Sequence, residues 1–309
     1  MSIAHVNARQ LRLVCDHSLR HSVRSGSGLV FLLLAVFLGL SVAYIFISPF
    51  ESFVAESATF GAAPESVERN MVNFARPWIE RLIAPRAVDD PQAQQRAEER
   101  TSRWVNYLLD DRPALLSAIF LVLLIGIPLL IPFGAFNQTA GDIGSRGLRY
   151  VLLRTERANI YYGRLLATML LTIGAQALVV LTIALYLGLK VRVYGGWELT
   201  SWSLQGLLAL SVLSLPYVAV CAWLSAAHDS PMGSLVTSNL IVGGVPLVAF
   251  LARFTWEPAY AVRYLLPWGV QDSLFAPDTF TVALAILACL GYTVAFTWLG
   301  ARKFERRDL

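Results

Sequence analysis

Charged residues are scarce in this chain of 309 residues, at 15% of the total, whereas an ordinary soluble domain has about a quarter. They are nearly absent from six apolar runs, each close to the roughly 20 residues that a helix needs to cross a bilayer. Core helices of a soluble protein would need a polar face toward water, which these runs lack. The sequence therefore predicts an all-α integral membrane protein with six transmembrane helices. The runs are Gly28–Phe50, Pro113–Phe136, Leu165–Leu189, Trp202–Ala227, Gly233–Ala252 and Thr279–Ala301.

Motifs for catalysis are also missing. A nucleotide-binding loop ends in Lys followed by Ser or Thr, and neither Lys190 nor Lys303 stands in such a context. The four histidines are scattered without a zinc-protease motif, and the three cysteines are not placed for an external disulfide. The spans hold almost no ionisable residue that could couple transport to protons or sodium. We therefore expect no catalytic residue, metal site or cofactor on this chain, and an energy source on another chain.

Arginines set the predicted orientation. Basic residues concentrate in residues 1–27, 137–164 and 302–309, and such clusters mark the cytoplasmic side of a membrane. With six spans, all three clusters fall on one side, so we expect both termini in the cytoplasm. Anionic lipid accounts for the pI of about 9.1, and no nucleic-acid partner is needed. The predicted location is a bacterial cytoplasmic (inner) membrane, with multiple passes.

The expected organisation follows from these boundaries. An interfacial helix occupies the N-terminal segment, a large helical loop joins the first two spans outside the membrane, and a coupling segment joins the second and third spans inside it. A basic tail ends the chain. The predicted segments are 1–27 for the N-terminal helix, 28–50 for span 1, 51–112 for the outer loop, 113–136 for span 2, 137–164 for the coupling segment, 165–301 for spans 3 to 6 and 302–309 for the tail.

Helical periodicity continues in the outer loop. Val67, Met71 and Phe74 begin one apolar series, and Pro91–Leu109 forms a second helical run with Asp90 as its N-cap. We expect two amphipathic helices that cover the outer ends of the spans, and the alternative is a lid or partner-docking surface. Arg253–Asp278, which is rich in aromatic residues and proline, is typical of a short interfacial or re-entrant element.

The segment Asp142–Arg164 combines an excess of arginine with apolar residues at helical spacing. A short amphipathic helix here would lie along the membrane surface and offer a docking face to a soluble partner. The alternative is that its arginines only anchor the segment to lipid headgroups. The candidate partner-binding residues are Arg146, Leu148, Arg149, Leu152, Arg154, Arg157 and Arg164.

Neutral polar residues and glycines inside the spans form a second candidate set. They could line a translocation path or allow close helix approach at a seam, and the alternative is that they form interhelical hydrogen bonds. The set is Gln176, Gln205, Ser211, Ser214, Asn239, Gly243 and Gly244.

These features together resemble the ABC-2 type permeases, the membrane subunits of ATP-binding-cassette exporters. The run RGLRYVLLR at Arg146–Arg154, Arg157, and the pair Gly163-Arg164 are similar to the family's basic run that enters span 3. The family usually has a proline where Thr155-Glu156 stands here. The tail from Phe304, FERRDL, resembles the family's closing Phe-x-Arg-Arg-Asp pattern.

The resemblance implies a permease subunit of the exporter type. Such a subunit couples ATP hydrolysis by separate ATPase subunits to movement of a substrate out of the cell. Its implied partners are two ABC ATPase subunits, which hold ATP and Mg, and a second permease copy or sister permease. Residues 142–164 and the N-terminal helix would sit in clefts of the ATPases. The rival interpretations are an ATP-driven envelope assembly or signalling module with no transported substrate, and an integral membrane enzyme.

Overall fold

A computed structural model describes the chain at residues 7–24, 26–59, 69–70, 72–74, 76–77, 79–80, 91–145, 147–153, 155–191, 194–255 and 257–307. Helices and short connections make up this part of the chain, with no strand in it. Six of its helices are long and apolar enough to cross a membrane. The predicted all-α, multi-pass architecture is therefore confirmed at this level.

The helices that follow one another along the chain alternate between long spans and short surface elements. In order they are α1 (Ala8–Arg24), α2 (Gly26–Thr59), α4 (Pro91–Leu109), α5 (Ala114–Ala135), α6 (Ala140–Gly144), α7 (Leu148–Leu152), α8 (Arg157–Lys190), α9 (Gly196–Ala227), α10 (Pro231–Thr255), the 3-10 helices η1 (Glu257–Leu265), η2 (Pro267–Gly269) and η3 (Asp272–Phe275), and α11 (Thr279–Glu305).

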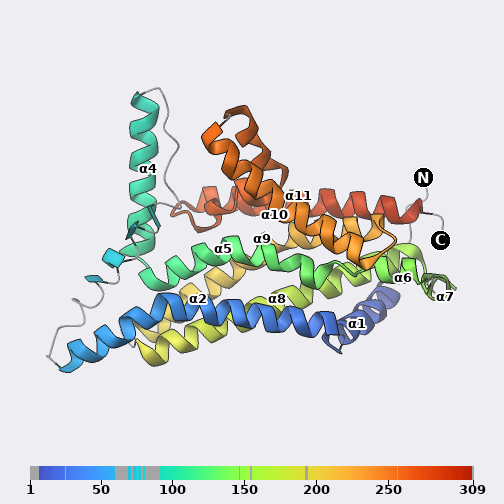
Figure 1. The fold of residues 1–309 in the computed structure, drawn as a ribbon, viewed down its shortest axis with the longest axis horizontal. Helices are drawn as coiled ribbons and strands as arrows, with labels where there is room; N and C mark the ends of the chain where they lie inside the picture. Colours follow the sequence, from blue (N-terminus) through green and yellow to red (C-terminus); the bar gives the residue numbers. More distant parts are fainter. Residues whose placement is uncertain are drawn as a thin grey trace.

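The bundle has two distinct ends (Figure 1). The short helices α6 and α7 lie at one end together with α1 and the last turn of α11, and we call this the basic end. At the opposite end α4 projects away from the bundle axis, and η3 packs against α9 and α11. Between the ends, α5 and α9 are the most enclosed spans, whereas α10 and α11 expose most of their apolar surface.

Four aromatic rings fill the bundle at the opposite end. The ring of Trp202, in α9, lies 6.2 Å from Tyr107, 6.4 Å from Phe120 and 5.7 Å from Phe275 between centroids. We call Tyr107, Phe120, Trp202 and Phe275 the aromatic cluster. Gly206 makes room for it, because a Cβ there would lie only 2.3 Å from the Phe120 ring. Large aromatic side chains therefore join α4, α5, α9 and η3.

The predicted outer-loop helix Pro91–Leu109 is confirmed as α4. The Trp104 indole Nε1 donates to the Phe275 carbonyl oxygen over 2.6 Å, which ties α4 to η3. The proposed cap Asp90 and most of the earlier apolar series from Val67 lie outside the described residues. The segment between α10 and α11 forms three 3-10 helices, consistent with the short element expected there.

Five of the six helices extend beyond the predicted runs, and α2 and α8 extend the furthest. α2 continues past Phe50 to Thr59, and α8 begins at Arg157 rather than at Leu165. Both extensions carry polar residues, so hydropathy alone makes the predicted spans too short. The start of α8 matters for function because it takes the last third of the predicted coupling segment into a membrane-spanning helix.

Candidate functional site at the basic end

The connection between α5 and α8, residues 137–156, contains two five-residue helices, α6 and α7. We call it the α6–α7 segment. The single amphipathic helix expected over Asp142–Arg164 is therefore wrong. Gly144 and Gly147 bracket the break, and glycine disfavours a continuous helix. Glu156, with φ −75° and ψ 152°, is extended and separates α7 from α8.

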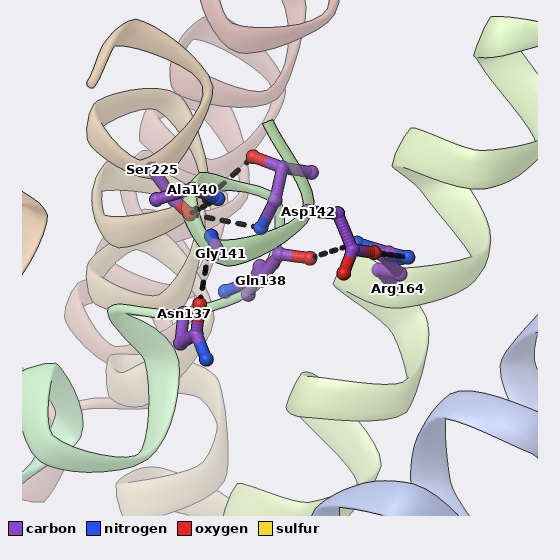
Figure 2. Close-up of polar contacts among 8 residues, drawn as sticks. Asn137, Gln138, Ala140, Gly141, Asp142, Arg164 and Ser225 are labelled. Atoms are coloured by element: carbon purple, nitrogen blue, oxygen red, sulfur yellow. Dashed lines mark hydrogen bonds and ion pairs between the residues drawn. The ribbon is translucent and has the colours of Figure 1, made fainter. Parts of the chain in front are cut away.

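A buried serine from another helix closes the start of α6. The Ser225 Oγ, in α9, accepts hydrogen bonds from the backbone N–H groups of Thr139 (2.9 Å) and Ala140 (3.0 Å). The Asn137 side-chain oxygen accepts the next one, from Gly141, over 2.9 Å. The first N–H groups of a helix have no partner within the helix. Ser225 therefore satisfies two donors that burial would otherwise leave unpaired, and Asn137 caps a third that is exposed. Figure 2 shows Ser225 facing the first turn of α6.

Arg164, in the second turn of α8, fastens α6 from the other side (Figure 2). Its guanidinium donates to the Gln138 carbonyl oxygen over 2.7 Å and forms an ion pair with the Asp142 carboxylate. The Arg164 side chain is only 18% exposed. An arginine that the sequence assigned to a partner thus joins the α6–α7 segment to α8 within the chain.

Arg157 holds the end of the chain. Its Nη1 donates to the carbonyl oxygens of Glu305 (2.9 Å) and Arg307 (2.7 Å), just beyond the last turn of α11. The Arg307 guanidinium in turn contacts the carbonyl oxygens of Ala226 and His228 and pairs with Asp229. We call Arg157, Arg307 and their partners the tail clasp. Carbonyls at helix C-termini lack partners and attract cations, so the clasp satisfies the ends of α9 and α11.

The apolar residues of α7 divide between the core and the surface. Leu148 is 1% exposed and Leu152 packs partly buried against the core, so neither offers a free face to a partner. Val151 and Leu153 are exposed instead, Leu153 at 83%. Helical spacing could not identify Leu153, because it depends on α7 ending at Leu152.

Three predicted residues of this segment carry no side-chain description. Arg146 and Arg154 lie outside the described residues, and of Arg149 only the backbone, within α7, is described. Their role as partner-binding arginines stays a prediction.

α1 packs along the first turns of α8. The buried side chain of Asn159 accepts from the Asn7 N–H (3.1 Å) and donates to the Gln10 side-chain oxygen (2.8 Å). Gly163 lets the two helices approach, since a Cβ there would lie 2.7 Å from a Val14 methyl group. The N-terminal helix is thus fixed to the bundle, and sequence reasoning gave Asn159 no part in this.

The polar residues predicted inside the spans make different kinds of hydrogen bond. Gln176 is buried and donates to the Leu210 carbonyl oxygen at 3.4 Å, which links α8 to α9. Ser214 and Asn239 instead bond to carbonyl oxygens of their own helices, those of Ser211 and Leu235. The interhelical bonds considered as an alternative are therefore made by Gln176 but not by these two.

The remaining residues of this set have different surroundings. Gln205 is exposed on α9. In α10, a Cβ at Gly243 would make ordinary contact with Leu129 of α5, and one at Gly244 would meet nothing within 4 Å. Gly244 is therefore open to a neighbour outside the chain, whereas Gly243 packs within it.

A scan against protein-family models finds no match for this chain, and a search of curated proteins finds none either. Its function is therefore argued from the motifs of the sequence and the geometry of the basic end.

Proposed function

We propose that this chain is the membrane-spanning permease subunit of an ABC-2 type exporter, driven by separate ATPase subunits at the basic end. In this proposal the basic end faces the cytoplasm of a bacterial inner membrane. ATP and Mg bind to the partner subunits, and a second permease copy or sister permease completes the assembly. The neutral polar side chains of the spans favour an amphipathic or apolar cargo over an ion.

The observation that carries the proposal is a pair of exposed apolar side chains at α7, next to α6, which is firmly attached to the bundle. Val151 and Leu153 are exposed at α7, while Ser225 and Arg164 fix the adjoining α6 to α9 and α8. Exposed apolar residues next to a basic segment suit a protein partner that covers the residues and pairs with the charges. A partner that pushed on α7 would move α6 and, through it, the spans.

The tail clasp extends this coupling to a third span. Arg157 joins the start of α8 to the end of α11, and Arg307 joins that end to the loop after α9. A displacement of the α6–α7 segment therefore reaches α8, α9 and α11 through hydrogen bonds rather than through flexible connections. The ATPase cycle would tilt these spans and open an outward path.

The direct test is to purify the tagged chain from its native membrane in mild detergent, identify the proteins that accompany it and assay ATPase activity. We expect a stoichiometric ATP-binding-cassette subunit with vanadate-sensitive hydrolysis. The Leu153→Asp variant should retain roughly a tenth or less of that subunit, because it places a charge in an apolar contact. Its thermal stability should match that of the wild type, since Leu153 is mostly exposed.

Met232→Asp is the matched control, since Met232 is also exposed, at 66%, and belongs to the first turn of α10 rather than to α7. Arg157→Glu is a poorer probe, because it would also break the tail clasp. Wild-type chain that purifies without any ATPase subunit would overturn the proposal. Equal loss in both Asp variants would show that α7 has no special role.

The assembly or signalling module remains the second candidate, and the projection of α4 favours it (Figure 1). α4 carries charged side chains such as Glu98, Glu99 and Arg100 that are exposed to solvent, beyond the spans. Such a face could hold an envelope protein while ATP hydrolysis moves α4. Cross-linking from α4 to one specific envelope protein, with no transported substrate, would support this candidate over export.

A further inference from the structure

A cleft of about 730 Å³ opens between α1, the end of α5, the α6–α7 segment and the start of α8. Gly28, Gly134 and Thr168 in its lining belong to the membrane-spanning helices α2, α5 and α8. The cleft thus lies where three spans reach the membrane surface, open to molecules from lipid or water. Its volume is in the range of small-molecule sites.

Hydrogen-bond donors are abundant in the lining of the cleft. α1 contributes the imidazoles of His17 and His21, and the α6–α7 segment contributes the Gln138 amide. The one carboxylate in the lining, that of Asp142, is already paired with Arg164. A ligand with several acceptor oxygens therefore suits the cleft better than a cation does.

The side-chain amide of Gln138 is an independent observation, because its N–H donors lack an acceptor in the described part of the chain. Its side chain is 8% exposed, and its Nε2 is buried with no hydrogen-bond partner among the residues that the structure describes. Its backbone carbonyl oxygen accepts from Arg164, and this bond leaves the side-chain amide unused. A buried unpaired donor costs free energy. The Nε2 atom has almost no accessible surface, so the side chain must rotate toward the cleft before a ligand oxygen can remove that cost.

The charge on α1 favours an anion. Four exposed arginines stand along this helix, and its single acidic residue, Asp16, pairs with Arg20 at 3.0 Å. A surplus of positive charge next to a cleft raises the local concentration of anions. The arginines are Arg9, Arg12, Arg20 and Arg24.

We propose that this cleft binds the phosphate group of a phosphate ester, with Gln138, His17 and His21 as donors. Phosphate offers several strong acceptor oxygens and a negative charge, as the lining requires. The ester is either a phospholipid headgroup at the membrane surface or a soluble phosphate, and Leu13 and Val14 in the lining give the first an apolar contact. The site needs no ATPase subunit, so it stands or fails independently of the proposed function.

The test is a ³¹P NMR titration of the full chain, purified in a phosphate-free detergent. The probes are dihexanoyl phosphatidylglycerol, a soluble short-chain phospholipid, and inorganic phosphate. We expect saturable broadening of a ³¹P signal by the wild type at millimolar probe or below. Gln138→Leu should bind roughly tenfold more weakly, because it removes a hydrogen bond to a charged group but keeps the backbone carbonyl and much of the side-chain shape.

A structural role for Gln138 makes a different prediction. Leucine removes an unpaired buried donor, so Gln138→Leu should melt at or above the wild-type temperature without ligand. Gln271→Leu is the matched control, because Gln271 is a buried glutamine, 3% exposed, next to η3 at the opposite end. Its affinity for either probe should equal that of the wild type. If Gln138→Leu melts lower, His17→Ala decides, since His17 is exposed on α1 and its loss should weaken binding severalfold.

The two probes distinguish the sources of the phosphate. Binding of the phospholipid alone supports a headgroup site, and equal binding of inorganic phosphate supports a soluble ligand. Absence of broadening by the wild type at millimolar concentration overturns the proposal. So does wild-type affinity in both the Gln138→Leu and His17→Ala variants.

Discussion

At the basic end, single polar side chains close the ends of helices, whereas at the opposite end four aromatic rings fill the space between helices. Ser225, Arg164 and Arg157 each satisfy backbone groups of another element. The aromatic cluster makes ring contacts instead, and Arg112 lies over two of its rings, at 5.3 Å from Tyr107 and 5.0 Å from Trp202. The same bundle is thus held by directional bonds at one end and by packing at the other.

The difference follows from what the chain does at each end. Two short helices and a chain terminus crowd the basic end, and every interrupted helix leaves N–H and carbonyl groups without partners. The opposite end also has a short helix, η3, but there four large rings fill the volume between the helices. An end held by hydrogen bonds can exchange one set of partners for another, which suits a site that responds to a partner. A packed aromatic end resists change.

The largest loss of stability is expected when the central ring of the aromatic cluster is removed. Trp202 is fully buried and contacts three other rings. Trp202→Ala should lower the free energy of unfolding by about 3 to 5 kcal/mol, because it leaves a large cavity. The measurement is an equilibrium unfolding titration in mixed detergent micelles.

Trp202→Phe is the control for that prediction. The Trp202 Nε1 is buried without a partner among the described residues, so losing the N–H removes no hydrogen bond there. The phenylalanine variant should therefore lose much less stability than the alanine variant. Equal losses in the two would mean that the indole N–H, rather than packing, stabilises this end.

A smaller loss of stability is expected from a substitution at the basic end. Ser225→Ala removes the acceptor for two buried backbone N–H groups, at Thr139 and Ala140, and should cost about 2 kcal/mol. Ser117→Ala is matched, since Ser117 is also buried in a span but its Oγ has no partner in the described part of the chain. That control should be close to neutral. Amide hydrogen exchange should locate the loss at α6, and a uniform change across the bundle would contradict this assignment.

The smallest expected effect is on the reactivity of the Cys15 thiol, which tests whether α1 stays attached to the bundle. Burial raises the pKa of the Cys15 thiol, and the neighbouring Asp16 carboxylate raises it further. Since the thiolate is the reactive form, a raised pKa leaves less of it at neutral pH. Alkylation of Cys15 by iodoacetamide should therefore be slower than that of a free cysteine, with its pH profile displaced upward, and Asp16→Asn should move the profile partly back.

The other two cysteines, Cys221 and Cys289, are buried in spans and should react only after denaturation. Mass spectrometry of the labelled peptide follows Cys15 alone. A rate and profile equal to those of a free cysteine would mean that α1 leaves the bundle in detergent, and that the bonds of Asn159 do not hold it.

Hydropathy was enough to predict the six spans, because twenty apolar residues in a row have few alternatives. Helical periodicity, rather than hydropathy, was enough to predict α4. The breaks on either side of α7 were missed because Leu148 and Leu152, which stand four residues apart within α7, suit a longer helix equally well. Gly144 and Gly147 indicated a break in the helix, but the prediction gave more weight to the pattern of charges.

The partners of the arginines could not be predicted for a different reason. Arg164 finds its partners 22 and 26 residues away, at Asp142 and Gln138, and Arg157 finds its own about 150 residues away in the tail. Positive charge in the sequence indicates a side of the membrane but not which carbonyl an arginine reaches. Ser225 is a similar case, since a serine in an apolar span gives no sign that it caps another helix.

The tail clasp also sets an order of folding. Translation runs from the N-terminus, so α8 and α9 are made and can enter the membrane well before Arg307, which lies 78 residues after its ion-pair partner Asp229. Until Arg307 has been made, the Ala226 carbonyl oxygen at the end of α9 lacks the guanidinium donor that it has in the folded chain. The basic end can therefore reach its final arrangement only after α11 is in place. A nascent chain held before Arg307 would keep this end open to chaperones and proteases.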